Sequence, residues 1–214
     1  MIGLAIKYPN GKSYFHNAEK QGKKQTKKKD FSFSKRGMTL EEELNESNDS
    51  YLAFERAVIH KKPTPIQIVS VDYPKRSAAV IKEAYFRQAS TTDYNGVYRG
   101  FYLDFEAKET KNKLSFPLKN FHQHQITHMQ QCLKQGAICF VVLRFSTTDQ
   151  IFLLEAAFLI DYWENQMKEG RKSIPISELE KNGYKLYYGL SPRIPYLDVV
   201  DHLIDKARSE KQNQ

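Results

Sequence analysis

The 214-residue sequence lacks any apolar run near the roughly 18 residues that a membrane-spanning helix needs. Its first residues also lack the charged-then-apolar pattern of an export signal. The two cysteines, Cys132 and Cys139, are too few for a disulfide framework, and their spacing is not that of a zinc knuckle or a redox pair. We therefore expect a soluble cytoplasmic protein with two buried thiols, built as one globular domain with appendages.

Positive charge is present in excess, but it is distributed unevenly. Residues 1–36 contain ten Lys or Arg against two acids, so this segment alone accounts for the formal net charge of +8. Its most basic part has almost nothing apolar to bury, which predicts a flexible arm that follows phosphates without reading bases. The lysines of this part are Lys23, Lys24, Lys27, Lys28 and Lys29. The alternative is a solubilising terminus without a specific role.

Beyond the arm, hydrophobic periodicity alternates between helix and strand. Thr39 and Glu42 have the spacing of a capping box and predict the start of a helix. Further helices are predicted at 118–135, 156–167 and 196–207. Strands are predicted at 57–59, 66–71, 101–107, 137–145, 151–154 and 184–188, with an amphipathic stretch around 80–86. This order indicates an α/β fold with a mixed sheet and helices packed on it.

The segment 101–108 carries the most unusual pattern in the sequence. Strand alternation places apolar side chains on one face and polar ones on the other. The polar face holds Tyr102, Asp104, Glu106 and Lys108. Two acids and a lysine at alternate positions on one strand face are costly to desolvate unless a cation or a ligand compensates them, so this face is a candidate site.

Two turns compete to set the partner of this strand. Asn95-Gly96 is the stronger generic signal for a two-residue hairpin, but it would leave Asp93 and Glu106 roughly 26 Å apart. A turn at Arg99-Gly100 instead places Asp93 opposite Glu106, and the apolar side chains of both strands then share one face. We prefer this register, with Asn95-Gly96 as a bulge or kink.

Two carboxylates that meet across a hairpin suit Mg²⁺, or Mn²⁺ in its place, which keeps waters and accepts phosphate oxygens. Such an ion activates water and polarises a phosphodiester, and Lys108 could stabilise the developing charge or orient the water. We therefore predict that Asp93, Glu106 and Lys108 form the centre of a metal-dependent DNA endonuclease. The alternative is an ordinary surface ion pair between Glu106 and Lys108.

Asp93 together with Glu106-Ala107-Lys108, in a strand–hairpin–strand–helix order, resembles the core of the PD-(D/E)XK nucleases. Thr92 stands where that motif has proline. Several longer blocks resemble the RecU Holliday-junction resolvases, in a similarity that runs from about residue 7 to at least residue 200. These blocks are residues 37–41, 60–65, 85–88, 90–96 and 104–111.

The resemblance implies a restriction-endonuclease-like fold, with a mixed central sheet flanked by helices and a protruding stalk at about 63–84. The nuclease domain would span 37–208, after the arm at 1–36 and before a flexible tail at 209–214. The resemblance also implies that Thr91 and Gln125 join Asp93 and Glu106 as metal ligands, and that Lys108 is the transition-state stabiliser.

The same resemblance implies a homodimer that makes paired nicks in four-way DNA junctions during recombination and repair, in company with recombinase and branch-migration proteins. Lys75 and Arg76 on the stalk would contact the junction. Glu41 resembles an acid that the first helix often contributes in this superfamily, although a favourable charge at a helix N-terminus explains it equally well.

Three other interpretations were weighed. A zinc site at His122, His124 and His128 is rejected, because no cysteine or carboxylate evidently completes a tetrahedral set. The chain could instead be a DNA-binding accessory protein with a vestigial nuclease centre, although the intact acids and lysine argue against loss of chemistry. It could also be a restriction endonuclease that cuts linear duplex at a defined sequence.

Overall fold

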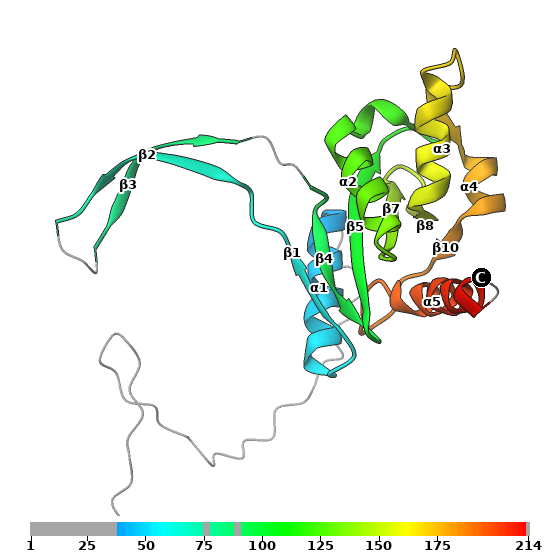
Figure 1. Cartoon of the computed structure of the whole chain (residues 1–214), viewed down its shortest axis with the longest axis horizontal. Helices are drawn as coiled ribbons and strands as arrows, with labels where there is room; N and C mark the ends of the chain where they lie inside the picture. Colours follow the sequence, from blue (N-terminus) through cyan, green and yellow to red (C-terminus); the bar gives the residue numbers. More distant parts are fainter. Residues whose placement is uncertain (1–37, 75–77, 88–90, 213–214) are drawn as a thin grey trace, which may run out of the picture. The chain divides into compact units, whose positions relative to one another are not determined.

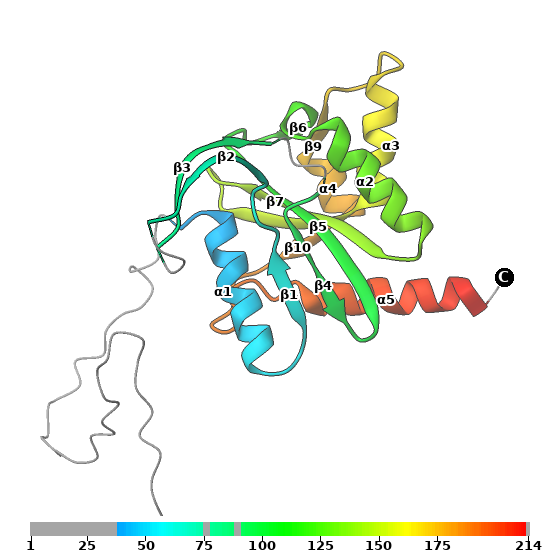
Figure 2. The ribbon, with the colours of Figure 1, turned by 60° about the vertical axis from the view of Figure 1, so that its left-hand side comes forward.

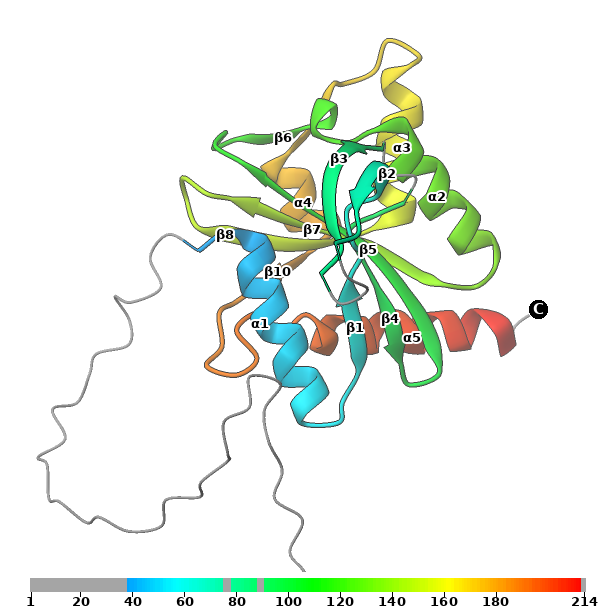
Figure 3. The ribbon, with the colours of Figure 1, turned by 90° about the vertical axis from the view of Figure 1, so that its left-hand side faces the viewer.

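A six-stranded mixed sheet organises the protein in the computed structural model, which describes residues 38–74, 78–87 and 91–212. The strands, in spatial order, are β1 (Val58–Lys61), β4 (Tyr94–Tyr98), β5 (Phe101–Thr110), β7 (Ile138–Phe145), β8 (Gln150–Glu155) and β10 (Tyr184–Leu186). Only β5 and β7 pair in parallel, and the other neighbours are antiparallel. Figure 3 shows β1, β4 and β5 lying side by side.

Helices cover both faces of this sheet (Figure 2). One face packs against α1 (Leu40–Ala53) and α5 (Leu197–Gln212), and the other against α2 (Gln123–Lys134) and α3 (Ala156–Gln166). Strand β7 is buried along its whole length, as expected for a central strand between two helical layers. Its side chains alternate between the two cores: Phe140 and Val142 join the first, Val141 and Leu143 the second. The expected α/β fold is confirmed.

Smaller elements complete the second layer. A short helical turn, η1 (Leu118–Asn120), follows β6 (Ser115–Pro117), which pairs with β9 (Ser173–Pro175), and α4 (Ile176–Asn182) comes next. None of β6, β9 and α4 was predicted, because segments of three to seven residues show too little periodicity.

Strands β2 (Ile66–Asp72) and β3 (Val80–Phe86) form a separate antiparallel ribbon, visible in Figure 1. Many of its apolar side chains are exposed: Ile66, Ile68, Val69, Val80, Ile81, Tyr85 and Phe86. Within the described residues, this ribbon hydrogen-bonds to no strand of the main sheet. It occupies the segment for which a stalk was expected, while Lys75 and Arg76 lie outside the described residues.

The predicted helices and strands are found with shifts at their ends. The capping box of Thr39 and Glu42 is present, and α1 begins at Leu40. The helix predicted from 118 is interrupted at Phe121 and restarts at Gln123, because the Gln125 side chain reaches back to the His122 N–H. Helix α5 runs to Gln212, into the segment expected to be a tail. In the described part of the chain, no helix is long and apolar enough to cross a membrane.

A buried ionic network fastens the start of α1 to the sheet. Glu43, only 3% exposed, receives the guanidinium of Arg144 from β7 at 2.8 Å. Arg144 also pairs with Glu109 and donates to the Met38 carbonyl at 2.9 Å, and Glu109 accepts the Leu40 N–H at 2.6 Å. Burial raises the pKa of Glu43, and Arg144 opposes that shift. The carboxylate thus stays charged because the guanidinium is beside it.

Removing Arg144 should leave the buried Glu43 carboxylate with only Arg193, whose Nε lies 3.6 Å away. We expect Arg144→Met to lower the free energy of unfolding by about 3–5 kcal/mol at pH 7, measured by urea denaturation. The loss should be smaller at pH 5, because the Glu43 pKa rises further in the variant and the group is then protonated rather than charged. Arg208→Met, which removes an exposed pair with Asp205, is the control and should cost less than about 1 kcal/mol. Equal losses in both variants would contradict the role of the network.

Candidate active site

The β4–β5 hairpin sets the position of every residue in the candidate site. Arg99 and Gly100 both have positive φ, 50° and 80°, as a tight two-residue hairpin turn of the primed kind requires. Tyr98 therefore pairs with Phe101, and Asn95 pairs with Asp104. The register predicted from a turn at Arg99-Gly100 is confirmed.

Gly96 has a different role from the one predicted. It lies in a regular ladder opposite Leu103, so there is no bulge or kink at this position. A Cβ atom on Gly96 would lie 2.2 Å from the Val58 carbonyl oxygen and 2.7 Å from the Ile59 Cα. Asn95-Gly96 therefore lies inside strand β4 and forms no turn. The glycine is needed there because any side chain would block the close approach of β1 to β4.

Asp93 and Glu106 come together as the register demands. Asp93 lies directly before β4, and its N–H donates to Glu106 Oε2 at 3.1 Å. The Ala107 N–H in turn points to Asp93 Oδ2 at 3.4 Å. Glu106 is fully buried and Asp93 is half-buried, so two acidic side chains share a largely desolvated position at the end of the hairpin.

This proximity changes the protonation of Glu106. Burial, followed by the neighbouring Asp93 carboxyl, raises the pKa of Glu106 to about 8, while Lys108 opposes the shift. The Lys108 ammonium lies 2.5 Å from Glu106 Oε1, but that oxygen has no aligned hydrogen-bond donor. Without a further cation, the lone lysine is not enough to keep both acids ionised at neutral pH.

The donor set fits a hard divalent cation. Two interacting carboxyl groups, one of them with a buried oxygen that lacks a hydrogen-bond donor, offer anionic oxygen ligands of the kind that Mg²⁺ and Mn²⁺ prefer. A positive ion between them would also remove the repulsion that raises the Glu106 pKa.

The side chains of Thr91 and Gln125 hydrogen-bond to neighbouring backbone groups rather than to the two acids. The Thr91 hydroxyl is half-buried and donates to the Thr92 carbonyl at 3.3 Å. Gln125 is buried on the first turn of α2, and its Oε1 accepts the His122 N–H at 3.0 Å. The described structure includes no hydrogen bond from either side chain to Asp93 or Glu106.

The remaining predicted residues lie at the edge of this region or outside the described chain. The Glu41 carboxylate, in the first turn of α1, forms an ion pair with Lys61 at the end of β1. The Glu41 carbonyl accepts the hydroxyl of Tyr94 at 3.2 Å, which links α1 to β4. The arm lysines, Lys23, Lys24, Lys27, Lys28 and Lys29, lie outside the described residues.

The sequence analysis placed Asp104 on the polar face but gave it no role. In the structure Asp104 is fully buried, and its carboxylate accepts from Lys62 at 2.8 Å, from the Tyr102 hydroxyl at 3.0 Å and from the Thr92 hydroxyl. Lys62 also donates its backbone N–H to the Asp93 carbonyl at 2.7 Å. These bonds tie the segment that carries Asp93 to β5.

The reason given above for rejecting zinc is wrong for one histidine. His128 Nε2 lies 3.1 Å from Asp104 Oδ2 and 3.5 Å from Cys132 Sγ, so a carboxylate and a thiol do accompany it. Cys132 is also half-buried rather than buried as expected. His128 and Cys132 are four residues apart on a helix, so the sequence could have predicted that they lie on one face. That Asp104 of β5 joins them depends on how α2 packs against the sheet, which the sequence does not reveal.

Known proteins resemble this chain along almost its whole length. The sequence model of RecU, Recombination protein U, matches residues 35–202. A protein of Lactiplantibacillus plantarum is 60% identical over 206 residues, covering 96% of this chain and 99% of that protein. One from Geobacillus sp. is 61% identical over 198 residues, covering 92% and 97%. Both relatives bear the name Holliday junction resolvase RecU. With a family match across most of the chain and identities near 60%, this chain belongs to the RecU family.

Proposed function

We propose that this protein is a Holliday-junction resolvase, a Mg²⁺-dependent endonuclease that makes paired nicks in four-way DNA junctions. The observation that carries the proposal is the position of Asp93 beside Glu106, whose carboxylate accepts the Asp93 backbone N–H, with the Lys108 ammonium next to them. The names of the relatives support the substrate, and the chemistry of the acid pair supports the reaction.

In the proposed mechanism Asp93 and Glu106 hold the ion with their carboxylate oxygens. Thr91 and Gln125 would add neutral oxygens, and Gln125 would exchange its bond to the His122 N–H for this role. When bound, Mg²⁺, or Mn²⁺ in its place, supplies an activated water and polarises the scissile phosphate. Ionisation of Glu106 accompanies binding, because only the carboxylate is a ligand.

Lys108 has a separate task. It lies on the same face as Glu106, two residues further along β5, and its side chain is 22% exposed, so its ammonium can reach a phosphate at the surface. We assign it to the stabilisation of negative charge that builds on the phosphate as water attacks.

Paired nicks require two centres, which supports action as a homodimer. Lys75, Arg76 and the basic arm are proposed to contact junction phosphates, and Glu41 remains a possible additional acid of the site. A cytoplasmic location and work beside recombinase and branch-migration proteins are consistent with a role in DNA recombination and repair.

The first test uses a labelled mobile four-way junction and a linear duplex of matched sequence, each with Mg²⁺ or with EDTA. The protein should nick the junction symmetrically and only with metal. Asp93→Asn and Glu106→Gln should each reduce the cleavage rate by about a thousandfold or more, because each removes an anionic ligand. Junction binding should persist in a mobility-shift assay.

Other outcomes of this assay favour the alternatives. A junction that is bound but uncut in Mg²⁺ supports an accessory DNA-binding protein. Cleavage of linear duplex at one defined sequence supports a restriction endonuclease. Full activity in both substituted proteins would show that the site is wrongly assigned.

The second test isolates Lys108. Lys108→Gln should lower the single-turnover cleavage rate by about 10²–10³-fold and change junction affinity little, because its charge acts mainly on the transition state. Lys181→Gln, at an exposed position on α4, is the matched control and should leave the rate unchanged. A proportional loss of affinity and rate would instead make Lys108 a simple phosphate contact.

The third test uses the raised pKa of Glu106. In EDTA, the ionisation of this buried group should destabilise the protein increasingly as pH rises from about 4.5 to about 8, and no further above that. Glu106→Gln should therefore raise the melting temperature at pH 8.5 and change it little at pH 4.5. Adding Mg²⁺ at pH 8.5 should raise the melting temperature of the unmodified protein only. A stabilisation by the substitution that is independent of pH would contradict this ionisation.

A further inference from the structure

Asp104, His128 and Cys132 form a second cluster of ligand-type side chains beside the proposed nuclease centre. Asp104 comes from β5, and His128 and Cys132 come from successive turns of α2. One ligand atom from each residue lies within 4.8 Å of the others. His128 Nε2 is in contact with both partners, at 3.1 Å from Asp104 Oδ2 and 3.5 Å from Cys132 Sγ.

These separations match the edges of a tetrahedral zinc site. Ordinary Zn–N, Zn–O and Zn–S bond lengths place a nitrogen and an oxygen ligand about 3.4 Å apart, and a nitrogen and a sulfur ligand about 3.6 Å apart. The two contacts of His128 are within a few tenths of an ångström of these values. The third pair, between Asp104 and Cys132, lies within 4.8 Å, so the nitrogen is already at coordinating distance from both other ligand atoms and these two need only close on the ion.

We propose that Asp104, His128 and Cys132 bind one Zn²⁺ ion, with water in the fourth position. His128 would bind the ion through Nε2 as a neutral imidazole that carries its proton on Nδ1. The Cys132 thiol would lose its proton to solvent when the Zn–S bond forms. The carboxylate and the thiolate then offset the two positive charges of the ion, while Lys62, which also pairs with Asp104, leaves one positive charge at the site.

The surroundings of Asp104 support a fixed ligand. The Thr92 hydroxyl donates to Oδ1, while Lys62 and the Tyr102 hydroxyl donate to Oδ2. Hydrogen-bond donors that hold a metal-binding carboxylate in place are a regular feature of metal sites. Lys62 and Tyr102 can keep their bonds when zinc replaces the His128 contact.

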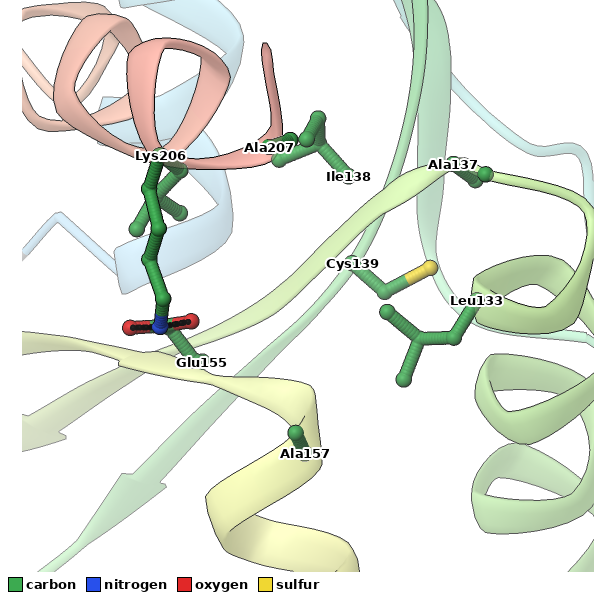
Figure 4. A pocket seen from close by; sticks show the side chains of 10 residues that line it. Leu133, Ala137, Ile138, Cys139, Glu155, Ala157, Lys206 and Ala207 are labelled. Atoms are coloured by element: carbon green, nitrogen blue, oxygen red, sulfur yellow. Dashed lines mark hydrogen bonds and ion pairs between the residues drawn. The ribbon is translucent and has the colours of Figure 1, made fainter. Parts of the chain in front are cut away.

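Access for the ion and its water comes from a pocket of about 690 Å³, whose lining includes Tyr102, His128 and Cys132. Cys139, the other thiol, lines a different pocket of about 400 Å³, shown in Figure 4 with Leu133 and the Glu155–Lys206 ion pair. Cys139 is not a member of the ligand group, although it carries the same chemical function. Its thiol is nevertheless a hydrogen-bonding neighbour of the Cys132 thiol, so it does not serve as an independent control.

The donor types separate this site from the Mg²⁺ site. A thiolate and an imidazole favour zinc and related ions, whereas Mg²⁺ prefers oxygen ligands alone. The inference does not depend on the proposed nuclease function, because none of its three ligands is a ligand of the nuclease centre. The two sites are nevertheless adjacent, since Asp104 and Glu106 share one face of β5.

The experiment is a titration of the full-length protein with Co²⁺, a spectroscopic substitute for Zn²⁺, in saturating Mg²⁺ to occupy oxygen-only sites. One equivalent should produce thiolate-to-cobalt charge-transfer absorption and the visible bands of tetrahedral cobalt, and Zn²⁺ should abolish both. Equilibrium dialysis with Zn²⁺ should give one tight site per chain. Absence of the charge-transfer band in the unmodified protein would overturn the proposal.

Substitutions test the ligand set. Cys132→Ser should remove the charge-transfer band, and His128→Asn should weaken cobalt binding by about tenfold or more. His202→Asn, at an exposed position on α5, should leave both unchanged. A band that survives in Cys132→Ser, or that disappears in His202→Asn, would refute the assignment. Circular dichroism of the metal-free proteins separates loss of ligand from loss of fold.

Asp93→Asn and Glu106→Gln keep the two inferences apart. Both variants should retain the cobalt band with unchanged stoichiometry, even where junction cleavage is lost. If they lose the band, the ion occupies the nuclease centre and the zinc site as proposed here does not exist.

Discussion

The candidate site depends on a two-residue turn. With Arg99 and Gly100 both at positive φ, the hairpin has one register. Its last pair is Tyr94 with Phe105, so the next residue out on each strand is Asp93 and Glu106 respectively. A slip of one residue would reverse the faces of β4, exposing Tyr94 and Tyr98. The packing of these buried tyrosines and the meeting of the two acids therefore rest on the same constraint.

The sheet must also accommodate charge in its interior. Asp104 and Glu106 are fully buried on the face toward α2, and Glu43 is buried where α1, which carries it, meets the sheet. Each of the three buried carboxylates is compensated by different groups. Glu43 has Arg144, Asp104 has Lys62 with two hydroxyl donors, and Glu106 has Lys108 but also the opposing Asp93. Glu106 is the least compensated of the three, and burial together with Asp93 raises its pKa to about 8.

Local patterns were sufficient for the hairpin and for the start of α1. Alternation, a tight turn and a capping box involve residues close in sequence, and the structure reproduces all three. The role of Gly96 was missed, because it depends on β1, a strand whose approach the local sequence does not reveal. The cluster of Asp104, His128 and Cys132 was missed for the same reason, since it forms only when α2 packs over β5. Thr91 and Gln125 came from family resemblance alone, and their contacts in the structure are with neighbouring backbone.

The backbone bond from Lys62 to Asp93 has a mechanical consequence. The β2–β3 ribbon leaves the sheet after β1, shortly beyond Lys62, and the chain returns from it just before Asp93. Together with the Lys62 ammonium, which donates to the Thr92 hydroxyl at 2.9 Å, this bond holds the outgoing and returning chains together at the root of the ribbon. A displacement of the ribbon would therefore act directly on the Asp93 backbone, and so on the position of an acidic residue of the site.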